Sequence, residues 1–391
     1  MRQVVMVAVG LAMLAGQGAQ TMEQRRAITA GAPPIGPYSP AVVAGGLVYV
    51  SGLLGTGADG QMVGPDVASQ TRRILDRMTE ILAAAGSSLG QTVSVSVFLK
   101  SPGDFEALNA TYREYFRESP PVRTTVVADL LNGALVEIAA IAVPKGATRE
   151  VLHPAGWVKS PRPYSYIIRT DDLVFLSGLV SRRGVDDALV PGSVDIQTTT
   201  ILDNAATLLK TAGVGLEDVV QSRVFITDEA LFAPMNDAYR PYFPKAPPAR
   251  ATAVARLMGS DFLVEVTLVA TRGEKEVLGA AATGAPLSTA VRAGTRVFLS
   301  GVLGNTATNV GDPVAQTREV MSRIDRTLTS AGMSFANVAD STVYLTDLTQ
   351  FAAMNGVYRE FFPSAPPARA TVGTRLVSRN AVVEIMMTAV R

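Results

Sequence analysis

The chain has 391 residues, of which 48% are apolar and 18% are charged, and its formal net charge is +1. This composition excludes general disorder, and the length is typical of two or three domains rather than one core. A balanced charge, without a dense basic block beside aromatic residues, argues against a dedicated nucleic-acid surface but leaves a local basic groove open.

Residues required by several classes of catalysis are missing or rare. The chain has no cysteine and a single histidine, His153. Disulfides, thiolate catalysis and cysteine-based metal sites are therefore excluded. A zinc enzyme normally needs more imidazole than this, and a Ser-His-Asp triad is equally short of material. His153 stands before a proline in an expected linker, and we interpret it as an ordinary loop residue.

The first twenty residues, MRQVVMVAVGLAMLAGQGAQ, differ from the rest of the chain. Arg2 precedes an apolar run from Val4 to Ala15 and then small and polar residues, which is the layout of a secretory signal. The run is shorter than the ~20 apolar residues of a membrane span. We expect residues 1–20 to be a signal peptide of an exported, periplasmic protein with no stable membrane span in the mature chain. The alternatives are an uncleaved lipid anchor, or a cytoplasmic protein that starts at Met22.

Strand and helix patterns then alternate along the chain. The apolar strand LVYVSGLLG (47–55) precedes a pattern at helical spacing, with an N-cap at Asp66 and a stop at Gly86. VSVSVFLK (93–100) alternates like a strand, and a shorter helix follows until Pro120-Pro121 forces an extended backbone. With two more strands after the prolines, the predicted order is strand-strand-helix-strand-helix-strand-strand, which is a mixed α/β unit.

The same landmarks occur three times in the same order. Each copy has a strand ending in Ser-Gly, a helix ending in Ala-Gly, an Asn-x-x-Tyr helix and a Pro-Pro-x-Arg phrase followed by a glutamate. The arginines at 123, 250 and 369 are 127 and 119 positions apart, whereas solenoid units span ~20–50 residues. Each copy is therefore a domain. We predict modules one to three at residues 26–145, 158–272 and 283–391, with linkers at 144–157 and 273–285.

Each predicted module has one sheet with two helices on one face, so its other face needs cover. Three modules in one chain can supply that cover by packing sheet against sheet around a pseudo-threefold axis.

The Pro-Pro-x-Arg phrase joins an arginine at the start of a strand to a glutamate among apolar residues. In module one, Arg123 and Glu137 are 14 positions apart, a span that a hairpin can place on neighbouring strands. A guanidinium offers a planar fork of donors for a carboxylate, and desolvation raises the pKa of a glutamate toward neutrality. Two interpretations stay open, because the pair can be a buried ion pair that fixes register or a functional site.

Longer phrases carry a resemblance to a known family. IGPYSPAV (35–42), VSGLLG (50–55), LNATYREYF (108–116) and PPVRTTVV with VEIAAIAV (120–143) resemble the RidA/YjgF family of enamine/imine deaminases, also called L-PSP endoribonuclease-like proteins. The resemblance covers nearly all of residues 26–391, three times over. It implies a chorismate-mutase-like α/β (α+β) fold with sites between adjacent modules, here an intramolecular pseudo-trimer that we expect to be monomeric.

The resemblance also implies a reaction without a cofactor or metal. In the implied reaction, reactive 2-enamino or 2-imino acids are hydrolysed to 2-keto acids and ammonia. The implied partner is therefore a small molecule, the imino or keto acid. The implied catalytic residues are a carboxylate-gripping arginine and a water-orienting glutamate in each module: Arg123, Glu137, Arg250, Glu265, Arg369 and Glu384. The implied substrate-binding residues are Tyr38, Ser51, Gly52, Asn109, Thr125, Tyr164, Ser177, Gly178, Asn236, Thr252, Ser300, Gly301, Asn355 and Thr371.

Two departures from the family pattern bear on function. Leu287 stands where the tyrosine is expected in module three, so at least one site is altered. The position two after each arginine, often cysteine in the family, is threonine in all three modules.

The asparagines could also have a helix-surface or capping role. Two rival functions remain, namely a non-catalytic binder of small carboxylates and, with the least support, the ribonuclease of the older label.

Overall fold

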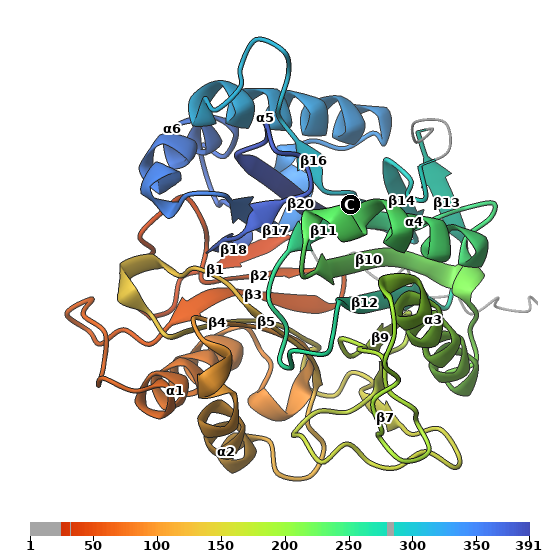
Figure 1. Ribbon diagram of the computed structural model, residues 1–391. Helices are drawn as coiled ribbons and strands as arrows, with labels where there is room; N and C mark the ends of the chain where they lie inside the picture. The colour runs from red at the N-terminus through yellow and green to blue at the C-terminus, as the bar shows by residue number, and fades with distance from the viewer. Residues whose placement is uncertain (1–24, 32, 280–284) are drawn as a thin grey trace, which may run out of the picture.

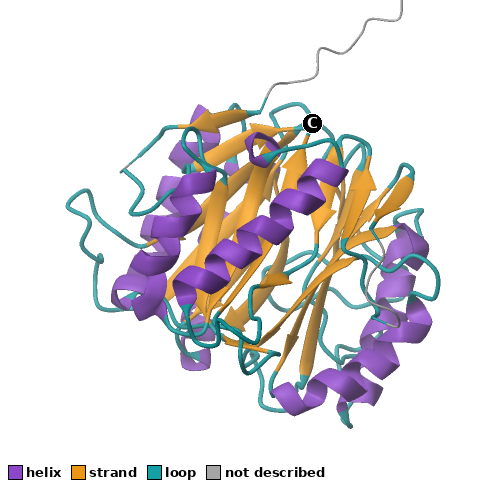
Figure 2. Cartoon of the chain, turned by 90° about the horizontal axis from the view of Figure 1, so that it is seen from above, coloured by secondary structure: helices purple, strands orange, loops and turns teal. Residues whose placement is uncertain are grey.

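The computed structural model describes residues 25–31, 33–279 and 285–391, so the predicted signal peptide lies outside the described residues. Three modules of the predicted α/β type stand around a common centre, and each contributes one sheet and one pair of helices (Figure 1). Seen from above, the strands occupy the interior and the helices lie on the outside (Figure 2). The chain therefore forms the expected intramolecular pseudo-trimer.

Module one begins its long helix at the predicted cap, where Asp66 accepts a hydrogen bond from the backbone N–H of Ser69 at 2.8 Å. The helix ends before Gly86, whose φ of +81° is the left-handed geometry that glycine tolerates best. Its elements are β1 (Arg26–Ile28), β2 (Ala41–Ala44), β3 (Leu47–Leu54), α1 (Val67–Ala84), β4 (Thr92–Leu99), α2 (Phe105–Tyr115), β5 (Val122–Val127) and β6 (Val136–Ala142).

Module two repeats this order, and one of its strands comes from the first predicted linker. Residues 150–152 form a strand that pairs with the sheet, so this segment is not merely a connection. The elements are β7 (Glu150–Leu152), β8 (Ile167–Arg169), β9 (Leu173–Leu176), α3 (Val194–Thr211), β10 (Val219–Ile226), α4 (Phe232–Tyr239), β11 (Ala249–Val254) and β12 (Val264–Thr271).

Module three likewise takes a strand from the second predicted linker, since residues 275–278 pair with β14. Its short strand β19 leaves the module and pairs with β11 of module two. The elements are β13 (Lys275–Leu278), β14 (Ala290–Ala293), β15 (Arg296–Leu299), β16 (Val302–Leu303), α5 (Pro313–Ser330), β17 (Val338–Leu345), α6 (Phe351–Phe361), β18 (Ala368–Gly373), β19 (Arg375–Leu376) and β20 (Val383–Val390).

The strand order contradicts the hairpin that we expected between the arginine and glutamate strands. In module one the order is β1-β2-β3-β6-β4-β5, so β4 lies between β5 and β6. The strand β5 runs parallel to β4, and β6 runs antiparallel to it. A parallel neighbour requires a crossover, which α2 supplies. Arg123 and Glu137 are therefore not on adjacent strands.

Two kinds of apolar core hold the molecule together. Each module has its own core between its sheet and its two helices. The opposite faces of the three sheets bury further clusters whose members come from all modules, which confirms the predicted sheet-against-sheet packing. Equivalent positions supply the aromatic rings of these shared clusters: Tyr49, Phe175 and Phe298 in one, and Phe98, Phe225 and Tyr344 in the other.

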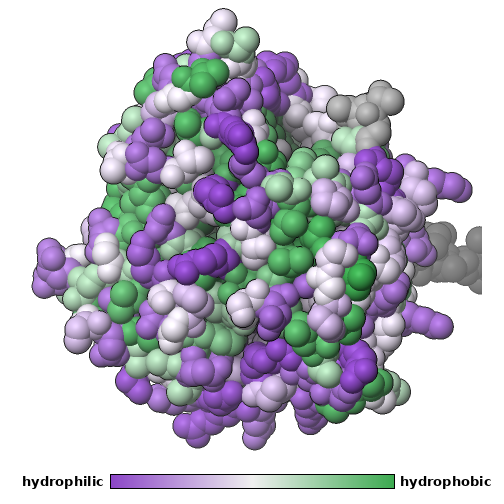
Figure 3. Space-filling view, in the orientation of Figure 1, coloured by the Kyte–Doolittle hydropathy of each residue, from purple (hydrophilic) through white to green (hydrophobic). Residues whose placement is uncertain are grey.

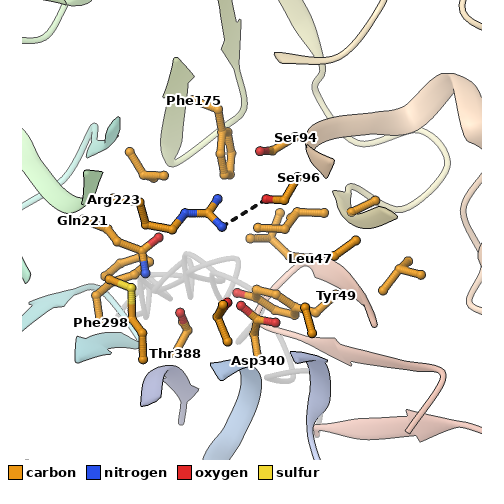
Figure 4. A pocket seen from close by; sticks show the side chains of 18 of the residues that line it. Leu47, Tyr49, Ser94, Ser96, Phe175, Gln221, Arg223, Phe298, Asp340 and Thr388 are labelled. Carbon is orange, nitrogen blue, oxygen red and sulfur yellow. Dashed lines mark hydrogen bonds between the residues drawn. The ribbon is translucent and has the colours of Figure 1, made fainter. Parts of the chain in front are cut away.

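A cavity of about 50 Å³, lined by both polar and apolar side chains, lies where the three sheets meet (Figure 4). Arg223 of β10 reaches across it, and its Nη1 donates to Ser96 Oγ at 3.0 Å. Asp340 of β17 lies on the other side, beside Tyr49 in the view of Figure 4. Burial raises the pKa of Asp340 to about 6, although the positive charge of Arg223 opposes the shift.

The outer surface is mixed in character. Hydrophilic side chains dominate the outline of the face in Figure 3, with smaller hydrophobic patches between them. The helices in the described part of the chain include none that is long and apolar enough to cross a membrane.

Candidate active site

The three arginines occupy equivalent positions at the boundaries between modules. Each lies near the start of a strand that follows the stiff Pro-Pro pair, and each is at most 3% exposed. The backbone N–H of each arginine donates to a serine of the neighbouring module. The pairs are Arg123 with Ser177 Oγ at 2.9 Å, Arg250 with Ser300 Oγ at 2.8 Å, and Arg369 with Ser51 Oγ at 2.8 Å.

These serines join the modules because a hydroxyl group can accept and donate at once. In the first site, Ser177 accepts from the Arg123 backbone and donates to the backbone oxygen of Ser165 at 2.7 Å. The next residue, Gly178, donates its N–H to the backbone oxygen of Arg123 at 3.1 Å. The Ser-Gly pair of one module therefore fixes the backbone of the arginine of another.

Each guanidinium lies against one or more aromatic rings, and those of Arg123 and Arg250 also donate to an asparagine of their own module. In the first site, the Arg123 carbon Cζ is 4.9 Å from the ring centre of Tyr112 and 5.9 Å from that of Tyr164, which belongs to module two. Its Nη2 donates to Asn109 Oδ1 at 2.7 Å. Cation–π contact and one amide oxygen hold the group in place without neutralising its charge.

The other two arginines have similar surroundings with informative differences. Arg250 donates to Asn236 Oδ1 at 2.6 Å, and Tyr239 is the single ring within cation–π distance of it among the described residues. Arg369 faces the rings of Tyr358, Tyr38 and Phe351 at 4.7, 5.4 and 5.7 Å. The second site, where Leu287 replaces the tyrosine of the repeat, therefore has the fewest rings around its cation.

Several guanidinium nitrogens are buried without a hydrogen-bond partner in the described residues. They are Nη1 of Arg123, Nε and Nη1 of Arg250, and all three nitrogens of Arg369. A buried donor without an acceptor costs about 1–3 kcal/mol, and more when it is charged. Such a group is stabilised by an anion that enters the site, and a carboxylate matches its planar fork.

The glutamate that faces each arginine comes from the next module. Glu265 is buried against Gly178, and the backbone N–H of Thr125 donates to it. A Cβ on Gly178 would collide with Glu265 Oε1, so glycine is required for this close approach. The same arrangement recurs with Glu384, Gly301 and Thr252 in the second site and with Glu137, Gly52 and Thr371 in the third.

Burial raises the pKa of each of these glutamates to about 8, and the opposing effects of the threonine N–H and the arginine charge are smaller. No ion pair within 4.0 Å joins any of these glutamates to an arginine in the described part of the chain. The buried ion pair that we left open as a structural interpretation is therefore absent here. Each site instead combines a buried cation with a carboxyl group that is mostly neutral at pH 7.

The residues implied by the resemblance fall into three inter-module sites. The first site combines Arg123, Asn109 and Thr125 with Tyr164, Ser177, Gly178 and Glu265, and the second combines Arg250, Asn236 and Thr252 with Ser300, Gly301 and Glu384. The third combines Arg369, Asn355 and Thr371 with Tyr38, Ser51, Gly52 and Glu137.

Three tyrosines of the aromatic wall are not among the residues predicted from the sequence. Tyr112, Tyr239 and Tyr358 each follow the site asparagine by three positions, which places them on the same helix face. The repeated Asn-x-x-Tyr phrase could have identified them. The first site also opens into a cavity of about 50 Å³, to which Phe262 and Met258 contribute from a loop that the repeat pattern does not reveal.

Comparison with known proteins identifies the family. A family model described as Endoribonuclease L-PSP matches residues 29–144, 158–272 and 278–391. The chain belongs to this family. It is the RidA/YjgF family that the sequence resembles, and this member has three tandem copies.

The relatives match one module at a time. The 2-iminobutanoate/2-iminopropanoate deaminase of Capra hircus is 45% identical over 118 residues, which are 29% of this chain and 86% of the relative. The 3-aminoacrylate deaminase RutC of Acinetobacter baylyi is 41% identical over 112 residues, or 28% of this chain and 89% of the relative. Deamination is thus an activity of the family.

One solved structure is similar over most of the chain. A crystal structure of chorismatase aligns with a TM-score of 0.52 and 14% identity, and the match covers 76% of this chain and 93% of that chain. At this identity the likeness concerns the fold alone.

Proposed function

We propose that this RidA/YjgF protein is a hydrolytic deaminase that converts reactive 2-enamino or 2-imino acids to 2-keto acids and ammonia. The observation that carries the proposal is the repeated pairing of a buried guanidinium, with unused N–H donors, and a carboxyl group of raised pKa across a module boundary. The names of relatives that deaminate 2-iminobutanoate, 2-iminopropanoate or 3-aminoacrylate support it.

In the proposed reaction, the free N–H groups of the arginine bind the substrate carboxylate and hold the imine carbon close to the glutamate. Fixing the reacting atoms in this way removes much of the entropic part of the barrier. In the first site these roles belong to Arg123 and Glu265.

Proton transfer then follows from the protonation state of the glutamate. The neutral carboxyl donates its proton to the imine nitrogen, and the resulting carboxylate accepts a proton from the water whose oxygen attacks the imine carbon. The carboxyl next protonates the amino nitrogen, the C–N bond breaks, and ammonia leaves. As the C=O bond forms, the hydroxyl proton passes to the glutamate carboxylate, which restores the neutral carboxyl. The balance is one imino acid and one water converted to one keto acid and one ammonia.

The proposed deaminase activity is tested with an imine that an oxidase generates in the assay. An amino-acid oxidase, with catalase to remove peroxide, supplies 2-iminobutanoate, and semicarbazide competes for the imine. We expect the purified full chain to lower the semicarbazone yield and to accelerate the appearance of 2-oxobutanoate in proportion to its concentration. An unchanged rate, with 2-oxobutanoate still bound in titration calorimetry, would instead identify a non-catalytic carboxylate binder.

A further inference from the structure

The first site carries two arginines that the other two sites lack. Arg162 of module two stands two positions before Tyr164, where module one has Gly36 and module three has Ala285. Neither of those residues can carry a charge.

The second extra arginine lies beyond the Ser-Gly pair. Arg182 follows Ser177 by five positions, where module one has Thr56 and module three has Asn305. The repeat therefore supplies two internal comparisons for each extra cation.

Both arginines line the cavity of the first site, together with its clamp and its glutamate. Their guanidinium groups share one counter-ion, because Nη1 of Arg162 and Nη1 of Arg182 lie 3.1 and 3.3 Å from Asp187 Oδ2. Arg182 also packs over Phe262, with 5.0 Å between Cζ and the ring centre. The cavity lining includes Arg123, Arg162, Arg182, Tyr164, Phe262 and Glu265.

The charges in this cavity are not balanced by the protein. Each of the two arginines uses only Nη1 in hydrogen bonds of its side chain within the described residues, so its Nη2 and Nε remain available. Asp187 offsets one of the two positive charges, and Glu265 is mostly neutral at pH 7. With Arg123 included, two positive charges remain, whereas a monocarboxylate supplies one negative charge.

The third site shows what the repeat looks like without these additions. Arg77 approaches it from α1, but its Nη1 is held by Thr56 Oγ1 at 2.8 Å and by the backbone oxygen of Leu54 at 3.1 Å. Thr56 therefore occupies the position of Arg182, so the third site has one further arginine near its clamp, Arg77, where the first site has two. Nothing comparable to Arg162 is present at Gly36.

We propose that the first site is specific for a substrate with a second acidic group, such as a dicarboxylic imino acid. Arg123 holds the carboxylate next to the reacting carbon, and Arg162 and Arg182 hold the distal one. The inference rests on the proposed function for the reaction, but the preference for a dianion stands on charge and geometry alone.

The experiment isolates the first site in the full-length chain. Arg250→Met with Arg369→Met removes the clamps of the other two sites, and titration calorimetry compares 2-oxoglutarate with 2-oxopentanoate, which has the same carbon count but one carboxylate. We expect 2-oxoglutarate to bind about tenfold tighter or better, as expected when an added charged hydrogen bond is formed.

Two further variants locate the cause of that preference. Arg162→Ala with Arg182→Asn, which install the residues of module three, should reduce the preference to threefold or less. Arg183→Asn is the matched control, because Arg183 is an exposed neighbour that pairs with Asp186 instead, and it should keep the preference. Equal affinities in the parent, or a preference that survives the double substitution, would overturn the proposal.

Turnover separates this inference from the proposed function. Glutamate oxidase supplies 2-iminoglutarate, and a general amino-acid oxidase supplies 2-iminopentanoate. Absent turnover of both imines, with the binding preference intact, would refute the deaminase and leave the dianion site standing. Turnover of both imines at similar kcat/KM without a binding preference would support the deaminase and refute the dianion site.

Discussion

The inter-module sites and the central cavity differ in how far they follow the threefold repeat. All three sites have the same arginine, asparagine, serine, glycine and glutamate at equivalent positions. On the strands around the cavity, in contrast, Ser96 corresponds to Arg223 and Thr342, and Asp340 corresponds to Ser94 and Gln221. The chemistry at the boundaries is repeated, whereas the chemistry at the axis is not.

Covalent linkage explains why this difference is possible. In a trimer of identical chains, any charged residue near the axis meets two copies of itself, and like charges at close range are destabilising. A single chain can place Arg223 and Asp340 across the same cavity as opposite charges (Figure 4). Residues near the axis can therefore differ between the modules of a single chain. Each boundary site still needs its complete set of groups.

The largest expected effect comes from removing the repeated clamp. Replacing Arg123, Arg250 and Arg369 together with methionine should lower kcat/KM for 2-iminobutanoate by about 10³-fold or more, because substrate binding and orientation are both lost. Arg326→Met, at an exposed position of α5, is the control. Tight binding of 2-oxobutanoate by the triple variant, with an unchanged Tm, would contradict the assignment.

Removing the repeated glutamates should affect turnover more than binding. With Glu137, Glu265 and Glu384 changed to glutamine, kcat should fall about 10²–10⁴-fold, and the Kd for 2-oxobutanoate should stay within about threefold. The pKa of each glutamate is raised to about 8, so the working acid form is lost as pH rises through 8. The native rate should decline there, and a flat native profile between pH 7 and 9 would refute this role.

The same pKa shift fixes the sign of an effect on stability. Because the folded pKa lies above the ordinary value of 4.5, these groups favour folding least when they are ionised. The stability that the protonated glutamates contribute is lost as pH rises from 4.5 toward 8. At pH 9 the variant with three glutamines should therefore have a higher Tm than the native chain.

The smallest expected effect concerns the axis. Asp340→Asn removes the penalty of ionising a buried carboxyl whose pKa is raised from 3.8 to about 6. The variant should be roughly 1–3 kcal/mol more stable than the native chain at pH 7.5. This gain should nearly disappear near pH 3.5, where the Asp340 carboxyl is mostly protonated in both the folded and the unfolded native chain. Denaturant unfolding at the two pH values measures it, with the exposed Asp237→Asn as control. An equal difference at both values would exclude the electrostatic cause.

The local sequence pattern predicted much of each module. The cap at Asp66 and the stop at Gly86 delimit α1 within a residue or two. The predicted order of helices and strands holds apart from short additional strands, among them β1, β7 and β13 at the start of the modules. The repeat identified the family and three equivalent sets of candidate residues, because capping, periodicity and proline geometry act over a few residues.

Only the tertiary structure decided which of these residues meet. The strand β4 separates Arg123 from Glu137, and packing between modules brings Glu265 to Arg123 instead. The linker strands, the cation pair of the first site and the charges at the axis depend on the same contacts. These contacts join residues far apart in the chain, and sheet order and module packing are set by apolar faces that no local pattern specifies.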